Sequence, residues 1–124
     1  MDGALGVTHP VIERRRRERA AAIARVRSWA DGLATRLTSL QAVAVFGSVA
    51  RGDFNKWSDI DVLVVAAELP ERYPERAELL SPVPPGVQPI IWTPEELARE
   101  RRRGNPIARE VDEIGVVAFG GFPG

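Results

Sequence analysis

The segment over residues 43–65 constrains the fold of this chain more than any other. It opens with an apolar run over 43–46 that is rich in valine, as is typical of a buried strand, and this run ends at Gly47 and Ser48. A second apolar run follows over 60–65. The segment therefore predicts two buried strands, joined through a turn that starts at a glycine.

A pair of carboxylates, Asp59 and Asp61, lies at the start of the second run. Because side chains alternate along a strand, carboxylates two residues apart project from the same face and can share one cation. Magnesium prefers such oxygen ligands, and it is typically bound by one or two carboxylates together with the phosphates of a nucleotide. Gly47 has no side chain, so backbone there can approach a ligand closely. A Gly-Ser pair alone indicates only a turn, but the spaced carboxylates favour a phosphate-and-metal site.

These residues resemble the signature of the DNA polymerase beta-like nucleotidyltransferase superfamily, in which Gly-Ser and Asp-x-Asp are separated by ten residues. The chain carries it as Gly47-Ser48 and Asp59-Ile60-Asp61, and the additional residues Arg51, Gly52 and Ser58 make it most similar to the minimal nucleotidyltransferase (MNT) branch. The resemblance is dense over 43–65 and continues more weakly to Val117. It implies an α/β domain with a mixed sheet of about four strands and helices mainly on one face.

The resemblance also implies roles for individual residues. The nucleotide-binding set would be Gly47, Ser48, Arg51 and Ser58, and the catalytic, metal-binding pair would be Asp59 and Asp61, with Mg²⁺ as cofactor and ATP as substrate. Gly47 and Ser48 would bind the β- and γ-phosphates at the N-terminus of a short helix, where N–H groups are unpaired. Arg51 has two interpretations, because an arginine fork can bind the triphosphate or hold the acidic strand in place.

One position departs from the family pattern. Relatives usually carry a third carboxylate five residues before the threonine that caps the next helix, and Thr93 puts that position at Gln88. Glutamine is neutral and takes no proton near neutral pH, so binding of the catalytic metal would be weakened. Loss of a general base typically costs about 10² to 10⁴ in rate. The alternative is a register shift caused by Pro89, while Glu68 and Glu95 are weaker candidates for a substitute carboxylate.

Two classes of function remain open at this stage. The resemblance implies an enzyme that transfers a nucleoside monophosphate, AMP from ATP, to a hydroxyl of a protein or small molecule. Proteins of the MNT branch often act as antitoxins beside a small helical HEPN partner, and some AMPylate it on tyrosine. The second class is a nucleotide-binding module that acts by forming a complex with such a partner. Gln88 favours the second class, whereas Asp59 and Asp61 favour at least magnesium-nucleotide binding.

Composition limits the number of domains and the kinds of site that the chain can form. With 124 residues, 44% of them hydrophobic and 27% charged, one globular domain is expected. The chain has no cysteine and one histidine, which excludes disulfides and thiolate metal sites. We predict a cytoplasmic location, since no apolar run suits a membrane span or a signal peptide. The formal net charge is zero, but residues 1–40 hold 8 basic and 4 acidic groups and the rest hold 9 and 13.

We expect a loose arm over 1–10, the nucleotidyltransferase domain over 11–119 and a flexible tail over 120–124. Apolar residues spaced by three and four predict an amphipathic helix over 11–37. These residues are Ile23, Val26, Ala30, Leu33 and Leu37. The arginine run over 14–19 at its start predicts a solvated helix face or, alternatively, a contact with nucleic acid or an acidic partner.

Turn and cap signals divide the remaining chain. In the loop after Arg51, Lys56 is interpreted as exposed, with phosphate contact as the alternative, and Trp57 as packing, with base stacking as the alternative. Pro89 marks its strand as an edge strand or as one that enters the sheet late. Thr93 and Asn105 each precede a proline, a combination that favours helix starts. The expected elements are helices over 75–80, 94–103 and 106–114, and strands over 87–92 and 116–119.

Overall fold

The computed structural model describes residues 9–55 and 58–124, so the first eight residues of the expected arm, Lys56 and Trp57 lie outside the described part. The elements follow in the order α2 (Pro10–Arg36), β1 (Leu40–Phe46), α3 (Gly47–Arg51), β2 (Ile60–Ala66), α4 (Tyr73–Leu80), β3 (Val87–Trp92), α5 (Pro94–Arg102), α6 (Pro106–Ile114) and β4 (Val116–Gly120). Each of these elements was expected from the sequence, with ends displaced by no more than a few residues.

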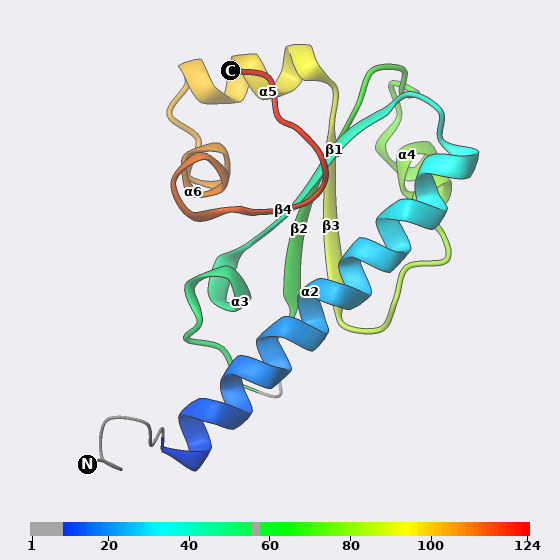
Figure 1. Ribbon diagram of the computed structural model, residues 1–124. Helices are drawn as coiled ribbons and strands as arrows, with labels where there is room; N and C mark the ends of the chain where they lie inside the picture. The colour runs from blue at the N-terminus through cyan, green and yellow to red at the C-terminus, as the bar shows by residue number, and fades with distance from the viewer. Residues whose placement is uncertain (1–8, 56–57) are drawn as a thin grey trace.

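The four strands form one mixed sheet in the order β3-β2-β1-β4 (Figure 1). β1 pairs antiparallel with both β2 and β4, and β2 pairs parallel with β3. The predicted α/β class and mixed sheet are confirmed. β3 lies at an edge, as Pro89 indicated, because a proline has no N–H to donate to a neighbouring strand.

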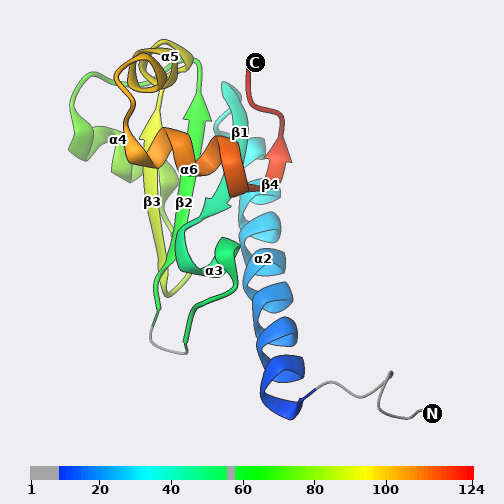
Figure 2. The same cartoon turned by 90° about the vertical axis from the view of Figure 1, so that its left-hand side faces the viewer.

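Helices cover both faces of this sheet. Val43 and Val45 of β1 pack into a core with α2, α3 and α4, while Ala44 and Phe46 pack into a second core with α5 and α6. Figures 1 and 2 show α2 running along one face, with α5 and α6 on the other. Three of the five described helices therefore share one face, but the other is covered more fully than we expected.

The long helix α2 carries the apolar stripe that its periodicity predicted. Ile23, Val26, Ala30 and Leu33 are buried against the sheet, and Leu37 is buried just after the helix. Full burial of one such side chain is worth about 1.5–3 kcal/mol. The N-terminal part of the helix has no buried residue before Ala22 and extends beyond the sheet (Figure 1).

Side-chain caps begin α5 and α6 where the sequence indicated. Thr93 Oγ1 accepts a hydrogen bond from the Glu96 N–H at 3.1 Å, and the Thr93 N–H donates to Glu96 Oε1 at 2.8 Å, which completes a capping box. Asn105 Oδ1 accepts from the Ile107 N–H at 2.8 Å. Glu96 also pairs with the buried Arg76 at 2.6 Å, so the same carboxylate joins α4 to α5.

The packed part of the chain continues past residue 119. Gly120 belongs to β4, and Phe122 packs against the second core beside α5 and α6. The expected tail over 120–124 thus begins inside a strand. None of the helices described combines the length and the apolar character that crossing a membrane requires.

Candidate active site

The turn from β1 into α3 packs directly on a carboxylate of β2. Phe46 and Asp61 are Cα partners in the antiparallel pairing. Gly47 follows with φ +74°, a left-handed conformation that glycine adopts without strain, and a Cβ added there would overlap Asp61 Oδ2. Only a residue without a side chain fits between the turn and this carboxylate.

Asp61 and Asp59 lie close enough to repel one another. Partial burial raises the pKa of Asp61, and the charges of Asp59 and Glu110 raise it further, while Arg51 acts in the opposite direction. Unfavourable proximity of like charges is what a bound cation relieves. The donor set, with its hard carboxylate oxygens, therefore fits a magnesium ion held by Asp59, Asp61 and a nucleotide phosphate.

Gln88 lies beside Asp61, where the sequence placed it. The two residues are Cα partners in the parallel pairing of β2 with β3, and the register runs on through Pro89 without a shift. Both project toward the face covered by α5 and α6, because Leu63 and Ile90, two residues further along each strand, belong to that core. Gln88 is therefore next to Asp61 in the sheet, and its place as the position of the third carboxylate stays a prediction.

No substitute carboxylate comes from the two positions considered earlier. Glu68 follows the end of β2, and Glu95 follows the end of β3. Since these strands are parallel, both residues lie at the opposite end of the sheet from Asp61 and Gln88. Within residues 9–55 and 58–124, no three His, Asp or Glu side chains gather in a metal-binding group.

Glu110 of α6, which the sequence did not indicate, also contacts the Gly47 turn. Its Oε1 accepts hydrogen bonds from the Gly47 N–H at 2.7 Å and from Arg51 Nη1 at 2.8 Å. The Gly47 N–H, expected to bind phosphate, is therefore already paired. Nothing in the spacing of Glu110 pointed to this contact, because more than fifty residues separate it from either partner. The only signal was the well-defined helix over 106–114.

Arg51 hydrogen-bonds to two carboxylates beside the turn, and its contact with a triphosphate stays a prediction. Its Nε donates to Asp53 Oδ2 at 3.2 Å, and its Nη1 donates to Glu110. The hydrogen bond with Asp53 and the surrounding carboxylates raise the pKa of the guanidinium further, so it stays charged. Arg51 thus lies at the turn as a fixed positive charge held by two acidic residues.

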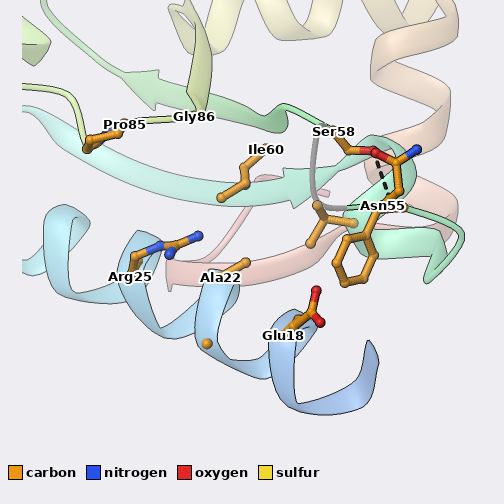
Figure 3. Close-up of a pocket in the computed structure, with 11 residues that line it drawn as sticks. Glu18, Ala22, Arg25, Asn55, Ser58, Ile60, Pro85 and Gly86 are labelled. Carbon is orange, nitrogen blue, oxygen red and sulfur yellow. Dashed lines mark hydrogen bonds between the residues drawn. The ribbon is translucent and has the colours of Figure 1, made fainter. Parts of the chain in front are cut away.

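The two serines of the expected nucleotide-binding set lie in different surroundings. Ser48 is partly exposed on α3, and its hydroxyl has no hydrogen-bond partner among the described residues. Ser58 lines a cavity of about 450 Å³ between α2 and the start of β2, where its hydroxyl accepts from the Asn55 N–H at 3.0 Å (Figure 3). This cavity is on the α2 side of the sheet, so the structure does not bring Ser58 together with the Gly47 turn.

The arginine run over 14–19 divides into two groups. Arg14 and Arg17 form ion pairs within the helix, with Glu18 at 3.8 Å and Glu13 at 3.9 Å, as on a solvated face. Arg19 instead donates to the carbonyls of Val49 and Ala50 at 2.9 and 3.0 Å. It thereby binds the C-terminal end of α3, the end of a helix that favours a cation.

The mixed sheet, with a glycine turn packed on a strand carboxylate, agrees with the nucleotidyltransferase resemblance of the sequence. The model of the nucleotidyltransferase domain family matches residues 26–109, more than half of the chain. The protein therefore belongs to the nucleotidyltransferase domain family. No match was found among curated proteins.

Two solved structures share the fold. A candidate nucleotidyltransferase from Sulfolobus solfataricus superposes with a TM-score of 0.63 at 23% sequence identity, over 83% of this chain and 84% of that one. A toxin–antitoxin structure with AMP-PNP gives a TM-score of 0.51 at 20% identity, over 77% of this chain and 73% of that one. At such identities the likeness supports the fold alone, and it agrees with the topology described above.

Proposed function

We propose that this protein is a magnesium-dependent nucleotidyltransferase that transfers AMP from ATP to a hydroxyl group of a protein or small molecule. The observation that supports the proposal is the close approach of Gly47 to Asp61, since these are the turn that would bind phosphate and the carboxylate that would bind the metal. Membership of the family makes a nucleotide the expected substrate.

The chemistry assigns distinct tasks to the residues of the site. Magnesium, held by Asp59 and Asp61, would neutralise charge on the phosphates. Ser48 and Arg51 would bind and orient the triphosphate, so that the acceptor hydroxyl attacks the α-phosphorus in line. A new P–O bond to the acceptor forms, the bond from the α-phosphorus to the bridging oxygen breaks, and pyrophosphate leaves. The acceptor proton passes to solvent, because Gln88 cannot take it.

We propose further that the acceptor is a small helical partner of the HEPN type, with this chain as its antitoxin. Two observations support the pairing: the MNT-like motif, and a related fold in a toxin–antitoxin structure that contains AMP-PNP. The cytoplasmic location expected from composition remains a prediction.

A second candidate function follows from Gln88. The neutral, exposed amide beside Asp61 favours a protein that binds magnesium-ATP without transferring AMP and acts by forming a complex with its partner. Such a protein would retain Asp59, Asp61 and Arg51 as binding residues only.

One experiment separates the two functions. Wild type and Gln88→Asp are incubated with Mg²⁺ and ATP radiolabelled at the α-phosphate, in the presence of a small helical protein encoded beside this one. Label on the partner with wild type would establish the transferase. Label only with Gln88→Asp, while wild type still binds ATP, would establish the binding module. No ATP binding by either form would refute both.

A further inference from the structure

Glu110 is the one described residue of α6 that hydrogen-bonds to the glycine turn, and it does so with a single oxygen. Oε1 accepts from the Gly47 N–H at 2.7 Å and from Arg51 Nη1 at 2.8 Å. Hydrogen bonds to an ionised carboxylate are stronger than neutral ones, and one acceptor shared by two donors fixes the donors relative to each other. We propose that Glu110 is a positioning residue for nucleotide binding, which orients Arg51 toward the triphosphate by tying its guanidinium to the Gly47 turn. This role rests on the proposed function.

The two acidic partners of Arg51 differ in how firmly they can hold it. Asp53 is 64% exposed and lies 3.2 Å from Nε, whereas Glu110 is 31% exposed and lies 2.8 Å from Nη1. Exposed ion pairs restrain little, so Glu110 is the stronger partner. Nη2 of Arg51 has no hydrogen-bond partner among the described residues, which leaves one end of the fork for an anion.

The helix that carries Glu110 is firmly placed. Val111, next to it in sequence, belongs to the second core, Ala108 on its other side is also buried, and Asn105 caps the first turn. A carboxylate on such a helix is held by the packing of the whole face, and a functional group is positioned best when rigid elements support it. The packing of α6 on the second core therefore fixes the position of Glu110 at the Gly47 turn.

The contacts of Glu110 also argue against a role as a third metal ligand. Its Oε1 already accepts two hydrogen bonds, and together with Asp59 and Asp61 it does not form a metal-binding group in the described part of the chain. Glu110 therefore acts on the nucleotide through Arg51 and not through the cation.

Calorimetric ATP binding to the full-length protein tests this assignment, with Mg²⁺ and, separately, with EDTA. The variants are Glu110→Ala, Glu110→Gln, Arg51→Ala and the double variant Arg51→Ala/Glu110→Ala. Glu113→Gln, an exposed glutamate of the same helix, is the matched control. We expect about tenfold weaker binding for Glu110→Ala and a smaller loss, about threefold, for Glu110→Gln, which keeps an acceptor oxygen.

ATP binding by the double variant distinguishes a positioning residue from a merely structural one. If Glu110 acts through Arg51, its removal from Arg51→Ala should weaken ATP binding by less than about twofold, and the loss in the single variant should appear with and without Mg²⁺. Unchanged affinity in Glu110→Ala would overturn the role. Tighter binding would mean that Glu110 competes with phosphate for the turn, and a loss confined to Mg²⁺ would mean that it binds the metal; both overturn it. If wild type binds no ATP, the proposed function itself fails.

Discussion

Asp61 on β2 and Gln88 on β3 are Cα partners in the parallel part of the sheet, so a neutral amide faces the carboxylate that is central to the site. In the proposed function Asp61 would bind the metal, whereas position 88 would lack a carboxylate that could accept the proton of the acceptor hydroxyl. The proposal therefore makes this pair the place to test for transfer.

Restoring a carboxylate at the neutral position should raise transfer. Because the register places residue 88 beside Asp61, Gln88→Asp adds a charge where it can assist the metal and the acceptor proton, and we expect an increase of about 10²-fold in the rate of label transfer. Gln41→Asp, at the only other glutamine, is the control and should leave the rate unchanged. Equal rates in wild type and Gln88→Asp would contradict the role assigned to this position.

Removing the charge of Asp61 should abolish magnesium-dependent ATP binding without unfolding the protein. Asparagine keeps the size of the side chain but is a far poorer magnesium ligand. Isothermal calorimetry of Asp61→Asn with and without Mg²⁺ checks this, with Asp31→Asn on the exposed face of α2 as the matched control. Unchanged affinity for magnesium-ATP would refute the metal assignment.

The same substitution should stabilise the metal-free protein at neutral pH. Burial, then Asp59 and Glu110, raise the pKa of Asp61 in the folded state. The folded state therefore binds this proton more tightly than the unfolded state, and stability falls as pH rises from the unfolded value of about 3.9 through the raised pKa. Asp61→Asn should melt at a higher temperature than wild type at pH 7, and this gain should shrink toward pH 4. A gain that grows on acidification would reverse the assigned direction.

Two glycines should respond to alanine in opposite directions. Gly47 has positive φ and lies against Asp61, so Gly47→Ala should cost about 1–3 kcal/mol and disturb ATP binding. Gly32 lies within α2 with open space around it, and Gly32→Ala should gain up to about 1 kcal/mol. Urea denaturation measures both. Similar losses at the two sites would show that the turn imposes no special constraint.

The arginine run offers a test of how α3 is held. Arg19→Ala should lower the free energy of unfolding by about 1 kcal/mol, because partly buried hydrogen bonds to the carbonyls of Val49 and Ala50 are lost. Arg16→Ala, at an exposed position of the same run, should have no measurable effect. Equal stability of the two variants in thermal unfolding would mean that Arg19 contributes only to a solvated face.

Local signals predicted most of the fold. The cap at Thr93, the stripe from Ile23 to Leu33 and the apolar runs around Gly47 each depend on residues within a few positions of one another, and the structure confirms them. The register of Gln88 was also predictable, because β3 leads directly into the capped helix that starts after Thr93.

Contacts between distant segments were not predictable in the same way. Glu110 meets Gly47 only because α6 folds back over β1, and helix periodicity contains no information on which element covers which face. For the same reason Arg19 was assigned to the surface run, although it binds the carbonyls at the end of α3. Ser58 was assigned to the nucleotide set by the resemblance alone; it lines the cavity on the α2 side, and its role stays a prediction.

The strand order has a consequence for the way the protein opens. β1 and β2 occupy the middle of the sheet and are hydrogen-bonded on both sides, whereas β3 and β4 are edges. Edge strands and helix ends open first in local fluctuations, and central strands exchange their amide protons last. Asp61 is therefore carried by the slowest-exchanging part of the molecule, while Gln88 lies on a strand that can detach without it. Asp61 on β2 should therefore stay in place when the protein opens partially, and β3, which carries Gln88, should be the strand that is released.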